Sequence, residues 1–278
     1  MFNRILYVVI AASTAVLVSI PSVSALDGLL ISTNLSGKER KDMTPQEYYT
    51  SVKLEAAKAY SESQALKSQG KFFEASKYMR KCLAIRHYFV ATDKEIPALK
   101  QKLGELLVAA GKNDEALQVF AEATGEFARW YGPGCTQSIA PLTMAGNIFL
   151  ARANYPKALN NFLQAYAISQ RNSGVNSPEC MNLRLQLAAS HKGSLQFEPA
   201  ATLYAEALDR QQKNEKLIDR ERLQTTLQDY ATVLKELKKG DEAAKILERA
   251  SAMQPADAKP GAGEDGQAKP VQQPVINK

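Results

Sequence analysis

Residues 146–165, GNIFLARANYPKALNNFLQA, read as the end of one helix, a short turn and the start of a second helix. Small residues stand at Gly146, Ala158 and Ala165, where two paired helices must approach each other closely. Phe162 supplies bulk between two of these positions. The stretch therefore predicts an antiparallel helical hairpin.

The same pattern of small and large residues recurs about every 42 residues on both sides of this stretch. Aligned on an alanine of the second helix, five repeats are separated by 41, 42, 42 and 43 residues. A large residue follows that alanine by four positions and a small one by seven; the sets are Ala75, Met79, Cys82; Ala116, Phe120, Ala123; Ala158, Phe162, Ala165; Ala200, Tyr204, Ala207; and Ala243, Leu247, Ala250. Twelve residues before the alanine the first helices carry a small residue, namely Ser63, Gly104, Gly146, Ala188 and Ala231. Such periodicity predicts stacked helix pairs that share one core.

This pattern of small, large and small residues with a turn glycine resembles the tetratricopeptide repeat. The period of about 42, with loops such as Gly174–Pro178, is similar to the long variant typified by kinesin light chains. The resemblance covers residues 44–253 and implies an all-α, right-handed superhelical solenoid of about five antiparallel helix pairs. Two departures stand out: the first repeat lacks the small glycine of its first helix, and the turn of the fifth repeat reads as one residue shorter.

Four segments are expected along the chain: a signal peptide at 1–25, a linker at 26–43, the helical repeats at 44–253 and a disordered tail at 254–278. Arg4 precedes an apolar run from Ile5 to Ile20, and Val23 and Ala25 offer small side chains at the positions that signal peptidase requires. The sequence therefore predicts cleavage after Ala25 and an exported, periplasmic or secreted protein. An uncleaved anchor is the alternative, since the run nearly spans a bilayer core; after cleavage no stable membrane span is expected.

Three cysteines leave an odd number in an exported chain. Cys82 occupies a small-residue position of the repeat, which indicates a buried, inert thiol. Cys135 and Cys180 precede the first helices of successive repeats, so a disulfide between them stays open, although paired helix axes usually lie too far apart for one.

Composition and motifs argue against nucleic-acid binding and catalysis. Lys and Arg outnumber Asp and Glu by 35 to 29 without a basic block, whereas phosphate contacts need clustered cations. His191 takes a first-helix position that is apolar in other repeats, and His87 lies near a helix end, so neither suggests a metal ligand. With no paired cysteine motif, phosphate loop or nucleophile elbow, we expect no enzyme, no cofactor and no metal.

In the resembled family, the first helices line a concave groove that binds partners. Carried over position by position, the groove residues expected to bind a partner are Tyr60, Gln64, Gln101, Glu105, Thr143, Asn147, Asn182, Leu185 and Gln228. Amides both donate to and accept from an extended peptide backbone. The alternative is that these are ordinary solvated helix positions. Trp130, Tyr131 and Tyr155 are expected to pack between repeats.

The sequence thus predicts a non-catalytic scaffold that binds a peptide or a partner domain in its groove, outside the cytoplasm. The alternative is an accessory subunit of an envelope enzyme, secretion or transport assembly. Either way the expected partner is a protein or peptide, and not a nucleic acid.

Overall fold

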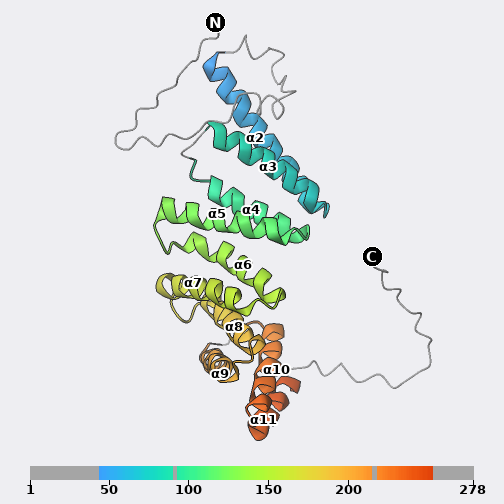
Figure 1. Ribbon diagram of the computed structural model, residues 1–278, viewed down its shortest axis with the longest axis vertical. Helices are drawn as coiled ribbons and strands as arrows, with labels where there is room; N and C mark the ends of the chain where they lie inside the picture. Colours follow the sequence, from blue (N-terminus) through green and yellow to red (C-terminus); the bar gives the residue numbers. More distant parts are fainter. Residues whose placement is uncertain (1–43, 90–92, 215–217, 253–278) are drawn as a thin grey trace, which may run out of the picture. The chain divides into compact units, whose positions relative to one another are not determined.

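A computed structural model describes residues 44–89, 93–214 and 218–252 (Figure 1). The predicted signal peptide, linker and tail lie outside these residues. The described residues form α-helices and one short 3₁₀ helix, with no strand among them. The α-helices are α2 (Pro45–Ser68), α3 (Phe72–Phe89), α4 (Ile96–Ala109), α5 (Asn113–Tyr131), α6 (Ile139–Ala151), α7 (Tyr155–Ser173), α8 (Pro178–Gly193), α9 (Phe197–Lys213), α10 (Arg220–Glu236) and α11 (Gly240–Ser251).

The chain divides into two compact units, residues 1–99 and 100–278. In the first unit, α2 and α3 pack against each other as the hairpin of repeat one. Thr44 caps α2: the Glu47 carboxylate accepts from the Thr44 backbone N–H at 2.8 Å, and the Thr44 hydroxyl accepts from the Glu47 N–H at 3.3 Å. Two otherwise unpaired backbone donors of the helix start are satisfied in this way.

In the second unit, helices adjacent in the chain are adjacent in space. The hairpin partners α6 and α7, α8 and α9, and α10 and α11 pack together, and α5 packs on α6, α7 on α8 and α9 on α10 (Figure 1). Two successive clusters of buried side chains, one around Phe162 and one around Tyr204, fill the space within and between these hairpins. Each hairpin therefore buries its apolar face against its neighbours in the sequence.

The predicted register is confirmed in all five hairpins. The anchoring alanine is fully buried in every repeat, and the small residues seven positions on are buried as well. In repeat three, a Cβ added at Gly146 would lie 2.5 Å from Cε1 of Phe162, and Gly104 stands against Phe120 in the same way in repeat two. The glycines are there because a phenylalanine ring occupies the space of their missing side chain.

All five turns within the hairpins have the same length and hydrogen bonds. In repeat three, the Asn154 N–H donates to the Phe149 carbonyl at 2.8 Å and the Ala153 N–H donates to Leu150 at 2.9 Å; the same two bonds close the other four turns. Each turn has one residue with positive φ. From repeat one to repeat five these residues are Gly70, Gly111, Ala153, Leu195 and Lys238. The expected shortening of the fifth turn was therefore wrong: Lys238, and not Gly240, takes the position of the turn glycine.

Leu195→Gly is expected to raise the free energy of unfolding by about 0.5–1 kcal/mol. Leu195 has φ 60° and a side chain that is 74% exposed, so it gains no burial to offset the cost of a left-handed backbone, about 1–2 kcal/mol for a residue with a Cβ. Gly111→Ala, at the same position of repeat two, should have the opposite sign. Chemical denaturation of both variants checks this, and a stability loss in Leu195→Gly would contradict it.

Candidate interaction surface

The predicted groove residues lie on the first helices of their hairpins, and most are neither buried nor fully exposed. Tyr60 and Gln64 lie on α2 in the first unit. In the second unit, Gln101 and Glu105 lie on α4, Thr143 and Asn147 on α6, Asn182 and Leu185 on α8, and Gln228 on α10. Of all nine, only Gln228 is exposed and only Leu185 is buried; the others are half-buried.

Leu185 does not belong to an exposed surface, so that prediction was wrong. Its side chain is only 6% exposed and lies in the hydrophobic cluster that holds Met181, Leu208 and Leu227. An apolar side chain at this position gains more from packing between α8 and the next hairpin than from facing water.

The hydrogen bonds divide the remaining second-unit residues into two groups. The Gln101 amide donates to Glu105 at 3.0 Å, and the Thr143 hydroxyl donates to the Ile139 carbonyl of its own helix at 2.8 Å. Asn147, Asn182 and Gln228 have no side-chain hydrogen bond to any residue that the structure describes. These three amides, on three successive first helices, are the groups that remain available to a partner. We call them the amide set.

A charged pair that the sequence did not reveal joins α8 and α10, two of the three helices that carry the amide set. The Lys192 ammonium on α8 lies 2.6 Å from the Asp229 carboxylate on α10, and the Tyr204 hydroxyl donates to the same carboxylate at 3.3 Å. Burial, reinforced by Asp229, raises the pKa of Tyr204 well above its ordinary value. Because Lys192 and Asp229 neutralise each other, this part of the surface favours an uncharged ligand segment.

Arg184 is a second feature that sequence reasoning missed. Its side chain is 2% exposed; Nη2 donates to the Tyr166 hydroxyl at 2.6 Å, and Nε lies 3.6 Å from the Glu206 carboxylate. Nε and Nη1 make no hydrogen bond, but both are enclosed by protein, so an approaching ligand does not reach them. Arg184 is thus a structural cation that holds α8 against α7 and α9.

A signal for this ion pair exists in the repeat. Lys100 stands 16 residues before its anchoring alanine, as Arg184 does, and its ammonium lies 2.6 Å from Glu122 and 2.8 Å from Glu126. Glu122 and Glu206 both follow their anchors by six residues. Pairing these two positions across the alignment would have predicted the contact.

Cysteines and histidines form no reactive cluster. Cys82, Cys135 and Cys180 are free, so the open question of a disulfide is answered against one, and burial raises the pKa of the Cys82 and Cys180 thiols. His191 is half-buried with Nδ1 2.7 Å from the Gln196 amide oxygen, which agrees with a packed residue, and His87 is exposed near the end of its helix. Within the described ranges, no three His, Cys, Asp or Glu side chains gather where a metal could bind.

The aromatic residues at the hairpin ends behave unequally. The Tyr155 ring at the start of α7 lies directly against Gly193 at the end of α8, so it packs between repeats as expected. Tyr131 is instead exposed at the end of α5 and contacts Phe127 of its own helix, with ring centroids 6.3 Å apart.

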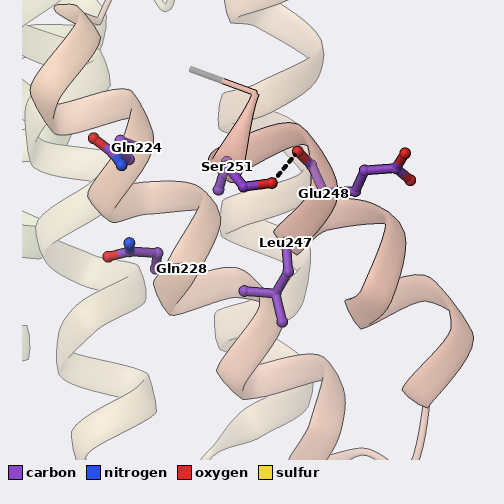
Figure 2. Close-up of a pocket in the computed structure, with 6 residues that line it drawn as sticks. Gln224, Gln228, Leu247, Glu248 and Ser251 are labelled. Atoms are coloured by element: carbon purple, nitrogen blue, oxygen red, sulfur yellow. Dashed lines mark hydrogen bonds between the residues drawn. The ribbon is translucent and has the colours of Figure 1, made fainter. Parts of the chain in front are cut away.

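A pocket of about 370 Å³ opens between α10 and α11 (Figure 2). Its lining includes Gln228 of the amide set, and the remaining residues are Gln224, Leu247, Glu248, Ala250 and Ser251. The two glutamines come from α10 and the others from α11, where Leu247 lies between the two helices (Figure 2). The pocket and the amide set therefore share Gln228, on the last described hairpin.

The tetratricopeptide repeat family model matches residues 95–171, which span α4 to α7. Residues 95–171 are tetratricopeptide repeats. The shared register of the other hairpins extends the same fold across the described helices. No curated protein matches the chain.

Solved structures confirm the fold of the tetratricopeptide repeats. BtubC (BKLC) from P. vanneervenii is similar with a TM-score of 0.64 and 15% identity, covering 84% of this chain and all of that one. A kinesin-light-chain-like protein of Podosopora anserina with nearly identical TPR-like repeats gives 0.60 and 18% identity, over 71% of this chain and 93% of that one. MamA from Desulfovibrio magneticus RS-1 has a TM-score of 0.56 and 15% identity, covering 74% of this chain and 98% of that one. At these identities the likeness concerns the fold alone.

No helix in the described part of the chain is long and apolar enough to cross a membrane.

Proposed function

We propose that this chain is a non-catalytic scaffold that acts outside the cytoplasm and binds an extended segment of a protein partner along the first helices of its repeats. Tetratricopeptide repeats build protein-interaction surfaces, and the expected signal peptide supports export. The observation that carries the binding site is the amide set: Asn147, Asn182 and Gln228 stand on successive first helices with their hydrogen-bonding groups unused.

The chemistry of the amide set fits a peptide backbone. Each amide offers two donors and one acceptor, whereas backbone N–H and C=O groups need one partner each. The neutralised Lys192–Asp229 pair adds no net charge to the surface of α8 and α10. The partner segment is therefore recognised through its backbone and by uncharged side chains, and not by a charge cluster.

The double variant Asn147→Ala, Asn182→Ala is expected to weaken partner binding without changing stability. Neither amide has a partner within the described structure, so truncation removes only contacts to the ligand, each a hydrogen bond of about 0.5–1.5 kcal/mol. Residues 26–278 and the variant are immobilised in equal amounts, and the proteins retained from native extract are quantified. Thermal unfolding of both proteins verifies that the fold is intact.

The matched control is Asn161→Ala, Asn172→Ala on α7. Both of these amides donate to carbonyls of their own helix at 2.8 Å, so the same chemical change is made away from the amide set. Equal loss of binding in the two double variants would contradict the proposed surface. Recovery of one discrete complex with envelope components, equally in all three proteins, would favour an accessory subunit instead.

A further inference from the structure

The pocket between α10 and α11 lies where the stack of hairpins ends within the described chain. α11 ends at Ser251, which itself lines the pocket, and residues 253–278 continue from that point. Comparing equivalent positions of repeats four and five indicates which kind of ligand this face can bind.

Three polar residues replace the apolar residues that receive the next hairpin elsewhere. Met181, Leu185 and Leu208 of repeat four are buried in the cluster that also holds Leu223 and Leu227 of repeat five. At the same three positions, repeat five has Gln224, Gln228 and Ser251. A further hairpin, or the end of a second copy stacked in the same way, would bury the two glutamine amides without hydrogen-bond partners. The pocket is therefore not a site for another repeat.

The lining instead fits an extended segment with aliphatic side chains. Leu247 and Ala250 give the pocket an apolar part. Gln224 and Gln228 lie one helical turn apart, about 6 Å along the axis, close to the roughly 6.6 Å that separates alternate residues of an extended chain. Glu248 is the charged lining residue, so a basic residue in the segment is favoured.

We propose that residues 270–278 of this same chain, PVQQPVINK, bind in the pocket and cover the Gln228 end of the amide set. Val271, Val275 and Ile276 are the branched aliphatic residues of 254–278. Pro270 and Pro274 each fix their own φ and disfavour a helical conformation in the preceding residue, so less conformational entropy is lost when the segment binds. Lys278 complements Glu248.

Because residues 270–278 are tethered to α11, even a weak interaction with the pocket is enough for them to bind there. Eighteen residues, 252–269, separate Ser251 from the segment. A random-coil chain of that length would have a root-mean-square span of about 20–25 Å, and tethers of this reach give effective concentrations in the millimolar range. The segment is thus a built-in competitor that a partner displaces at the Gln228 end of its site. This consequence rests on the proposed function, whereas the docking itself does not.

Site-specific crosslinking in the purified full chain tests the docking. A side chain bearing a diazirine is introduced at position 228, and crosslinked peptides are identified by mass spectrometry after irradiation. The expected result is crosslinking within one chain to residues 270–276, reduced to the background level by the double change Val275→Asp, Ile276→Asp. The matched control carries the diazirine at Glu236, an exposed position of the same helix outside the pocket.

Crosslinks confined to residues 253–260, crosslinks between two copies, absence of any crosslink to 270–276, or equal yields from the two probe positions would each overturn the proposal. A chain in which 270–278 do not dock can still bind a partner through Asn147 and Asn182. Failure of this experiment is therefore distinguishable from failure of the proposed function.

Discussion

Phe162→Ala is expected to lower the free energy of unfolding by about 3–5 kcal/mol, the usual cost of truncating a fully buried phenylalanine. The Phe162 side chain has no exposed surface, and its ring lies against Gly146 in a cluster shared by α6, α7 and α8. Its loss leaves a cavity that the glycine has no side chain to fill.

Denaturant unfolding followed by circular dichroism measures this cost. Leu163→Ala is the matched control, because Leu163 is the next residue of α7 and is 53% exposed; its truncation should cost less than about 0.5 kcal/mol. Equal costs for the two truncations would mean that the register of repeat three is wrong.

Gly146→Ala is expected to destabilise the protein by about 1–3 kcal/mol, although alanine is the better helix former. The added Cβ would stand 2.5 Å from Cε1 of Phe162, so the ring has to move within a filled core. Gly125→Ala provides the matched comparison, since Gly125 is also helical, on α5, but nothing lies within 4 Å of an added Cβ.

The two glycine substitutions should therefore change stability in opposite directions. Gly125→Ala should raise the free energy of unfolding by about 0.5–1 kcal/mol, because it removes only the backbone freedom of glycine. Thermal or chemical unfolding of both variants gives the signs directly. A stabilising Gly146→Ala would show that α6 and α7 do not approach each other as closely as the structure has them.

Much of the fold was predictable because the repeated pattern of small and large residues indicates which side chains contact each other. Gly104 and Gly146 accompany phenylalanines four residues after the anchor, whereas Ala231 accompanies Leu247. In these repeats the small residue of the first helix leaves room for the large residue of the second. This complementarity recurs at a fixed period, and it needs no knowledge of how the hairpins are oriented.

The turns were less predictable because glycine does not mark them consistently. Ala153, Leu195 and Lys238 take the left-handed position that Gly70 and Gly111 take in the first two repeats. Sequence reading therefore misjudged the length of the turn of repeat five. The hydrogen bonds of the hairpin, and not the residue type, impose that backbone conformation.

The surface was predictable only as a set of positions. Leu185 has the register of a groove residue but is buried, because α10 packs on that side of α8. The apolar side chain of Leu185 also favours a place in the core. Thr143 and Gln101 have groove registers as well, yet their polar groups are used within the chain. Which groups stay available depends on rotamers and neighbours, and a single sequence does not specify them.

Hydrogen exchange with and without a recovered partner tests the central claim most directly, because it locates the partner on the chain. If the partner binds along the first helices, amide exchange should slow in α6 and α8, which carry Asn147 and Asn182, while the exposed face of α7 and α9 keeps its rate. Slowed exchange confined to α5, α7 and α9, with α6 and α8 unchanged, would contradict the account.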